Sequence, residues 1–87
     1  MSYKVVGVVY EIDSQKNAPG RFTVPEGVCT YLGIDKGARV QVEVDSGSGH
    51  HGPTTRELKS DREPSPVGEM ADWMQKGERI RVIVTTA

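Results

Sequence analysis

One stretch of the sequence, residues 20–44, decides the fold and reads GRFTVPEGVCTYLGIDKGARVQVEV. It begins with a short segment, Arg21–Val24, whose apolar and β-branched residues predict a strand. Pro25 ends that strand because it has no N–H to donate, and it suits the first position of a helix. The apolar positions that follow are spaced to share one helical face: Val28, Tyr31 and Leu32. Since Gly33 favours the left-handed conformation that closes a helix, a short helix is predicted between Pro25 and Gly33.

Hydrophobic patterning predicts the remaining strands. Arg39–Val44 alternates valines with polar residues, which is typical of a strand with one buried face. Arg79–Thr85 shows a similar alternation near the end of the chain. Val5–Tyr10 is almost continuously apolar, so we expect a strand buried on both faces. Thr54–Ser60 has weaker strand character and is predicted as an edge strand.

A second short helix is predicted after Pro66, with Ser65 as its cap. Its apolar residues recur at helical spacing: Val67, Met70, Ala71 and Met74. Trp73 lies off that stripe, and packing against the end of a barrel or contact with a partner protein are both open. Residues 46–53, SGSGHHGP, follow no regular pattern and are interpreted as a flexible connector.

The second half of the chain repeats the pattern of the first. In each half an arginine precedes a proline by four residues: Arg21 and Pro25, then Arg62 and Pro66. The Lys-Gly turn and alternating strand at residues 36–44 recur at residues 76–84. We therefore interpret residues 1–87 as one β-barrel domain with two similar halves, about 3–45 and 54–87. Pairing the halves about a pseudo-twofold axis would close the sheet and remove exposed edges.

Composition narrows the class of protein. The 87 residues suit one domain, and the single cysteine, Cys29, excludes an internal disulfide and a cysteine-rich zinc site. An unpaired thiol fits a reducing compartment, so a cytoplasmic location is expected. No apolar stretch approaches the ~20 residues that cross a bilayer, so no membrane association is expected. The net charge of −1, from 11 basic and 12 acidic residues, means that a DNA-binding surface would require local clustering of cations.

The motifs Gly20–Pro25, Leu32–Ile34 and Lys36–Val40 resemble the AbrB/MazE/SpoVT family of DNA-binding proteins. That family combines a Gly-Arg, a β-branched pair, a proline, a short helix ending in Leu-Gly-Ile, and a turn before a strand. The resemblance covers roughly Tyr3 to Asp45. The residue patterns predict a mainly β fold with two short helices. The resemblance implies that it forms a small swapped-hairpin barrel, or a double-psi-like barrel if one chain supplies both halves. A monomer with internal pseudo-symmetry and a homodimer are both open.

The resemblance also implies double-stranded DNA as the partner and transcription regulation as the function. Such proteins bind through basic residues of the first strand, the loop after it and the helix. The candidate DNA-binding residues here, including two from the second half, are Lys4, Lys16, Arg21, Lys59 and Arg62. Two helix positions where the family often carries arginines hold Cys29 and Thr30, which cannot neutralise phosphates. The alternative is a non-catalytic protein-interaction module on the same barrel, with a protein partner instead of DNA.

No set of residues predicts an enzyme. His50 and His51 adjoin in a glycine-rich segment, but no cysteine, histidine or acidic residue accompanies them at metal-ligand spacing. Cys29 lies beside the apolar stripe of the predicted helix, so we interpret it as a buried, inert thiol. We expect no catalytic residue, no metal and no cofactor.

Overall fold

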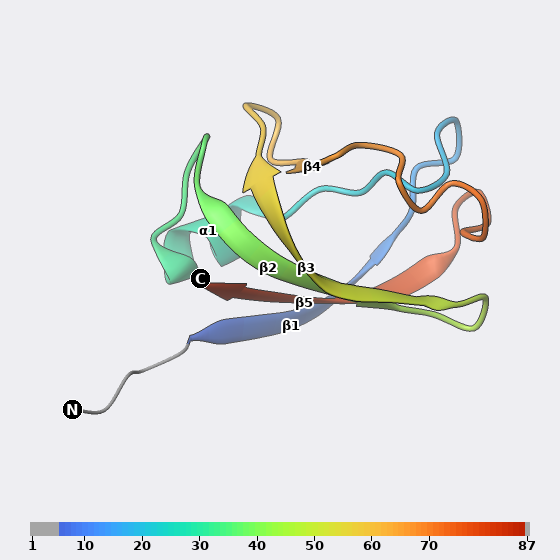
Figure 1. Ribbon diagram of the computed structural model, residues 1–87, viewed down its shortest axis with the longest axis horizontal. Helices are drawn as coiled ribbons and strands as arrows, with labels where there is room; N and C mark the ends of the chain where they lie inside the picture. The colour runs from blue at the N-terminus through green and yellow to red at the C-terminus, as the bar shows by residue number, and fades with distance from the viewer. Residues whose placement is uncertain (1–5, 87) are drawn as a thin grey trace.

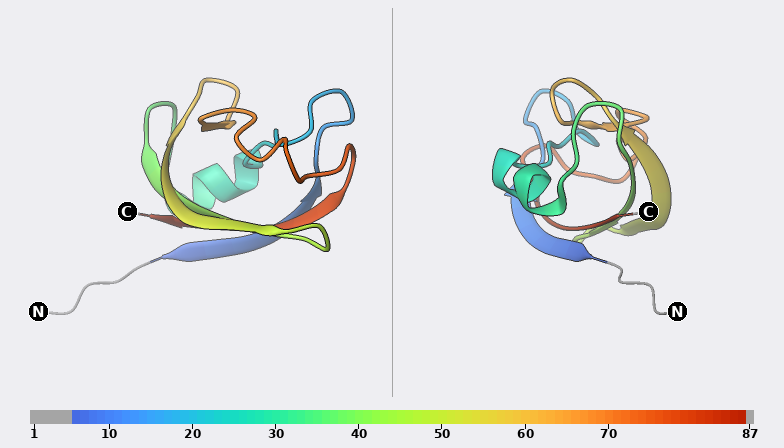
Figure 2. Two further views of the ribbon diagram at one scale, coloured as in Figure 1. Left: turned by 45° about the vertical axis from the view of Figure 1, so that its right-hand side comes forward. Right: turned by 90° about the vertical axis from the view of Figure 1, so that its left-hand side faces the viewer.

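A curled antiparallel sheet with one helix makes up residues 6–86, which are the residues that the structure, a computed structural model, describes. Its elements follow in the order β1 (Gly7–Asp13), α1 (Glu26–Leu32), β2 (Arg39–Asp45), β3 (His50–Leu58), β4 (Pro64–Ser65) and β5 (Arg79–Thr86). The strands lie side by side in the order β1-β5-β2-β3-β4. The sheet curls into half of a barrel, and α1 and the long loops lie across its concave side (Figure 1, Figure 2). The expectation of a small, mainly β fold is confirmed.

The central strands β2 and β5 follow the alternation that their sequences predict. On both strands the even-numbered side chains are buried in the curl, as far as Val44 on β2 and Val84 on β5. The two strands pair with Glu43 opposite Ile83. The core of buried apolar residues comprises Phe22, Val24, Cys29, Val40, Val42, Val44, Leu58, Met70, Met74, Ile80, Val82 and Val84. The strands thus form the floor of the core, and the loops and α1 supply its cover.

The first strand, β1, is an edge strand, which corrects the expectation of a strand buried on both faces. It pairs only with β5, from Gly7 opposite Thr85 to Asp13 opposite Arg79. Its burial alternates, and Val9 on the convex side is 59 % exposed. A continuous apolar run does not distinguish a central strand from an edge strand whose concave-side residues meet the core.

The flexible connector expected at residues 46–53 is shorter in the structure. His50 and His51 already belong to β3, where they pair with Asp45 and Val44 of β2. The hairpin turn is closed by a backbone hydrogen bond from Ser46 N to Gly49 O at 3.0 Å. A Cβ at Gly49 would lie 2.8 Å from the ring of Trp73, so glycine permits that close packing. The short β4 pairs only with Glu57 and Leu58 of β3, so the rest of β3 has β2 as its one neighbour within residues 6–86.

The helix α1 ends as its sequence predicts, with Gly33 in the left-handed region at φ 67°. The second helix is wrong: residues 67–73 form a series of turns. Gly68 adopts φ +80°, which interrupts helical backbone at the start of the segment. Of the four apolar residues in the predicted stripe, Met70 and Met74 are buried, Val67 is partly buried and Ala71 is exposed. Within residues 6–86, no helix has the length and apolar character needed to cross a membrane.

The strand expected at Arg21–Val24 is absent from the part of the chain that the structure describes, because this segment forms no ladder. Phe22 and Val24 are 3 % and 0 % exposed, so the segment contributes to the core without joining the sheet. Val24 N donates to the backbone oxygen of Arg62 at 2.9 Å. That contact joins the loop before α1 to the loop between β3 and β4.

Hydrogen bonds repeat between the two halves of the chain. One pair of equivalent bonds runs from Ser14 N to Glu78 O at 2.8 Å and from Leu58 N to Ala38 O at 3.0 Å. A second pair runs from Gln15 N to Arg21 O at 3.1 Å and from Lys59 N to Glu63 O at 3.0 Å. In these two pairs of bonds, β3 takes the place of β1 and β2 takes the place of β5. Glu63 then takes the place of Arg21. The spacing to proline in the sequence had instead matched Arg21 with Arg62, which is one residue earlier.

Candidate interaction site

Two of the expected DNA-binding cations, Arg21 and Lys59, converge on a buried carboxylate. Arg21 Nη2 lies 2.6 Å from Oε2 of Glu63, a residue that is 2 % exposed. Lys59 Nζ lies 4.0 Å from the same oxygen, and Gln15 Nε2 donates to the other carboxylate oxygen at 2.7 Å. The hydrogen bond with Glu63 is the main reason that the pKa of Arg21 is raised above its usual value. These cations therefore balance a buried charge, and less of their field is directed to solvent.

The other expected cations do not join this cluster. Arg62 has a left-handed backbone at φ 64° and lines a groove beside Cys29 and Thr30 of α1. The stem of Lys16 lies over Gly77 at the far loop. Lys4 lies outside the described residues. The structure thus brings together Arg21 and Lys59, with Arg62 in the same loop region, and leaves Lys16 apart.

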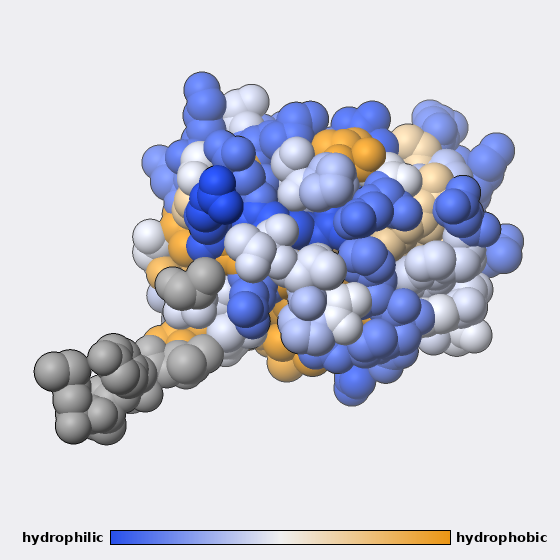
Figure 3. All heavy atoms as spheres, viewed as in Figure 1, coloured by the Kyte–Doolittle hydropathy of each residue, from blue (hydrophilic) through white to orange (hydrophobic). Residues whose placement is uncertain are grey.

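The convex face of the sheet carries charges of both signs. Arg79 Nη1 lies 3.2 Å from Asp13 Oδ1, and Arg81 Nη2 lies 3.2 Å from Asp45 Oδ2. His50 Nε2 lies 3.2 Å from Glu43 Oε2. Because acids accompany the arginines, the convex face lacks the cationic excess that a nucleic-acid surface shows. The side of the molecule seen in Figure 3 is mostly hydrophilic, with apolar surface in small separate areas.

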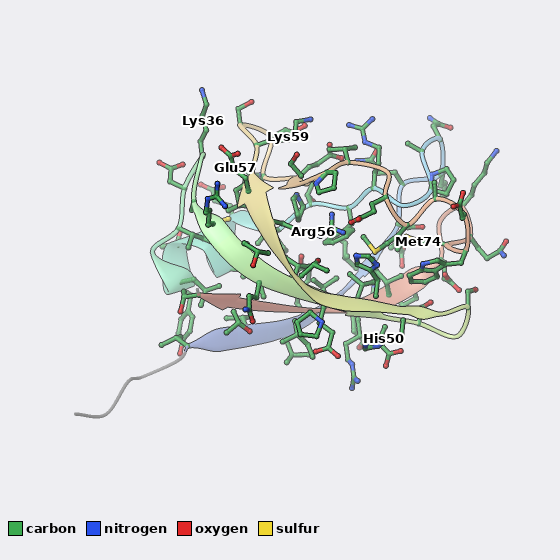
Figure 4. The ribbon with its side chains drawn as sticks, viewed as in Figure 1. Lys36, His50, Arg56, Glu57, Lys59 and Met74 are labelled. Carbon is green, nitrogen blue, oxygen red and sulfur yellow. The ribbon has the colours of Figure 1, made fainter. Side chains whose placement is uncertain are left out.

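A second buried charge, Arg56 on β3, holds the loop after β4. Its guanidinium is 2 % exposed and contacts the carboxylate of Glu69 and, at 2.9 Å, His51 Nε2. It also donates to the backbone oxygen of Pro66 at 2.8 Å and to Thr54 Oγ1 at 3.1 Å. Figure 4 shows Arg56 and Met74 on the concave side of the sheet and His50 on the opposite side. All three nitrogens of Arg56 have at least one partner, so this buried group stabilises the fold.

Chemically reactive groups are scarce in the described part of the chain. Cys29 is 7 % exposed, and burial raises the pKa of its thiol. A thiol with a raised pKa is a poor nucleophile at neutral pH. No group of three or more metal-ligating side chains gathers within residues 6–86.

The free backbone edge of β1 is the feature that sequence reasoning missed. Ser14 N donates to Glu78 O, and Thr86 N donates to Val6 O, so the even-numbered residues of β1 face β5. The amides and carbonyls of the odd-numbered residues point to the other side: Gly7, Val9, Glu11 and Asp13. Within residues 6–86 no hydrogen-bond partner reaches these groups. The edge therefore presents a row of donors and acceptors at strand spacing.

An apolar groove lies beside this edge, between β1 and α1. Its volume is about 310 Å³, and its lining is Gly7, Val8, Gly27, Val28 and Tyr31. Tyr31 is 72 % exposed, and it and Val9 are the large apolar side chains left exposed among the described residues. The spacing predicts that Tyr31 shares one helical face with Val28, and both side chains line this groove. Open apolar surface next to unpaired backbone groups is typical of a site that receives an extended segment.

The opposite end of the sheet is protected where β1 is not. There, β4 covers the last two residues of β3, with Glu57 opposite Ser65 and Leu58 opposite Pro64. The strand β3 also contains Pro53, and its pairing with β2 shifts register between Val42 and Val44. Prolines, bulges and short covering strands are the usual means by which sheet edges avoid pairing. A β-branched run without proline was the signal in the sequence for an unprotected β1.

Comparison with known proteins finds no family model, no curated protein and no solved structure that matches this chain.

Proposed function

We propose that this protein is a non-catalytic protein-interaction module that binds an extended segment of its partner along the free edge of β1. The observation that carries the proposal is the row of outward backbone groups at Gly7, Val9, Glu11 and Asp13, next to the apolar groove. A strand added to a sheet edge gains affinity from main-chain hydrogen bonds and specificity from the pockets that its side chains enter.

The groove sets the chemistry of the preferred segment. Gly7 and Gly27 lack side chains at its walls, and a Cβ at Gly27 would meet no atom within 4 Å. Val28 and Tyr31 supply the apolar surface. A partner strand lies about 4.8 Å from the strand that it pairs with, so its side chains would contact these groups. The segment should therefore be extended, with an apolar residue at the position that faces α1.

Amide NMR tests this function without knowledge of the natural partner. The probe is a short peptide of alternating threonine and valine with a lysine at each end. Its addition should shift the amide signals of the odd-numbered residues of β1 and slow their exchange with solvent. The even-numbered amides of β1, already bonded to β5, are the internal control. If no odd-numbered amide responds at about 1 mM peptide, where even weak binding of about 4 kcal/mol registers, the proposal is wrong.

DNA binding is a second candidate, supported by one groove. Lys36 and Lys59 line the same hollow of about 400 Å³ together with Ser60, Ser65 and one carboxylate, that of Glu57. Both lysines extend from loops at one end of the curl (Figure 4). Phosphates of double-stranded DNA would be bound there by two ammonium groups and two hydroxyls, with Arg62 in the adjoining groove.

A salt titration tests the DNA candidate. Each phosphate contact adds about 0.9 to the slope of log K against log salt, so Lys36→Ala should lower that slope by about 1. Lys76→Ala, a change of the same kind in a loop outside the groove, should leave the slope unchanged. Absence of binding near 50 mM salt, where a site with two or three phosphate contacts gains about tenfold or more in affinity over 200 mM salt, would exclude this candidate.

The resemblance to the AbrB/MazE/SpoVT family bears on the architecture. We propose that the half-barrel is a single-chain relative of the swapped-hairpin or double-psi type. The repeated hydrogen bonds at Ser14 and Leu58, and again at Gln15 and Lys59, support this assignment. In this proposal the two halves of one chain take the places that two chains take in the family.

A further inference from the structure

We infer that the segment received by the edge of β1 is β1 of a second copy of this chain, paired antiparallel about a two-fold axis at Val9. The inference rests on the proposed function and names its partner. It is argued from the sequence of the edge, from the exposure of Val9 and from the unequal protection of the two related strands.

The sequence of β1 is complementary to itself in one register. With the axis at Val9, each Val9 lies opposite its copy and each Gly7 lies opposite Glu11 of the other chain. No two like charges then face each other among the described residues. An axis at Glu11 would instead set two carboxylates directly opposite, which is destabilising. An axis at Tyr10 would set Val9 against Glu11 and leave the valine beside a charge.

Exposure favours the same register. Val9 is 59 % exposed on the convex face, although it is a β-branched apolar residue in a strand. Pairing with its copy would set the two valines side by side and shield part of each from water. The residue pairs would be of the hydrogen-bonded kind, because the odd-numbered amides and carbonyls already point outward. On each chain, the outward backbone groups of Gly7, Val9 and Glu11 would form hydrogen bonds with the other copy.

The edge of β1 has no device that hinders pairing with a further strand. Across the sheet, β3 contains Pro53 and shifts register against β2 between Val42 and Val44, and β4 covers its last two residues, Glu57 and Leu58. Within residues 6–86, β1 contains no proline and has β5 as its one neighbour. Small domains often gain stability by association, and a second copy is the partner always present at matching concentration.

Sedimentation velocity on the full chain tests the inference. The wild type should sediment as a concentration-dependent dimer. Val9→Lys should raise the dissociation constant of the dimer at least about tenfold, because it replaces an apolar pair with two like charges. Thr55→Lys, which adds the same charge on an exposed position of β3, should leave the dimer unchanged. A mixture of Val9→Lys and Val9→Glu should restore association, since the two charges then face each other.

Each contrary result has a distinct meaning. A wild type that stays monomeric at about 1 mM overturns the inference, and the proposed function survives if the threonine-valine peptide still shifts the odd-numbered amides. If neither association nor peptide binding occurs, both are wrong. A dimer that Val9→Lys and Thr55→Lys affect equally overturns the β1 interface. A dimer that Val9→Lys strengthens overturns the axis at Val9. Circular dichroism of each variant establishes that the fold is retained.

Discussion

Arg21 Nη2 lies 2.6 Å from Glu63 Oε2, across 42 residues of sequence, and the pair joins the two halves of the half-barrel. The hydrogen bonds that relate the halves align these two positions, so an arginine in one half faces a glutamate in the equivalent place of the other. A buried carboxylate requires such partners, because an ionised group removed from water is costly when unpaired. This contact gives Arg21 a structural role in joining the two loops, whatever else its exposed part contacts.

Replacing Glu63 with glutamine should destabilise the fold by about 1–3 kcal/mol, the usual range for a hydrogen bond to a charged group. The amide keeps the shape of the side chain, but it loses the charge that Arg21 and Lys59 face. Urea unfolding measures the change. The control is Asp13→Asn, which breaks the exposed pair with Arg79 and should change stability by less than about 1 kcal/mol. Equal effects of the two substitutions would show that the Glu63 cluster has no special role.

Tyr10 should make stability fall at alkaline pH. Its hydroxyl donates to the backbone oxygen of Thr23 at 3.0 Å, and burial raises the pKa of its phenol well above the usual value. The unfolded chain therefore releases this proton first. Stability from the neutral phenol is fully present below about pH 10 and is lost progressively above it, by about 1.4 kcal/mol per unit of pH.

Tyr10→Phe isolates this contribution. The variant should lose about 1 kcal/mol at pH 8 because the hydrogen bond is gone, but its stability should fall less steeply than that of the wild type between pH 10 and 11. Urea unfolding at several pH values gives both quantities. Tyr31→Phe is the matched control, since Tyr31 is 72 % exposed and the wild-type slope should be kept. Identical slopes for wild type and Tyr10→Phe would contradict the prediction.

Cys29 should react slowly with a thiol reagent in the folded protein and rapidly in urea. Its sulfur lies 3.8 Å from the backbone oxygen of Val24, it is 7 % exposed, and burial raises its pKa. Both burial and a raised pKa reduce the amount of accessible thiolate. The measurement is the rate of reaction with a chromogenic disulfide at pH 8, with and without denaturant. Equal rates would mean that the loop around α1 opens readily.

Local patterns in the sequence predicted the parts of the fold that depend on local physics. The alternation at Arg39–Val44 and the glycine at the end of α1 are set by side-chain direction and backbone sterics within a few residues. The burial of Met70 and Met74 was likewise predictable from their spacing. The turns of residues 67–73 were not, because a single left-handed glycine at Gly68 overrides the apolar period.

The candidate site depended on long-range pairing, which the sequence does not express. Whether an apolar strand is central or at an edge is decided by which other strands reach it, and β1 has only β5 as a neighbour. The partners of Arg21 and Lys59 are set by tertiary contacts that bring Glu63 between them. Cations that the sequence suggests for ligand binding can therefore form ion pairs within the fold. Conversely, an apolar residue such as Val9, which the sequence suggests is buried, is exposed at the edge of the sheet.

The same substitution at two glycines should have opposite effects on stability. Gly20 has φ +84°, and a Cβ there would lie 2.4 Å from the backbone nitrogen of Ala71, so Gly20→Ala should cost more than about 2 kcal/mol. Gly27 lies in α1 with open space around it, so Gly27→Ala should raise stability by about 0.5 kcal/mol through helix propensity. Thermal unfolding of both variants measures the difference. A tolerated Gly20→Ala would mean that the loop before α1 does not pack against residues 70–71.

Because Gly27 also lines the groove beside β1, its alanine variant should weaken binding of the threonine-valine peptide even though the protein is more stable. That separation of stability from binding is expected only if the groove receives the segment.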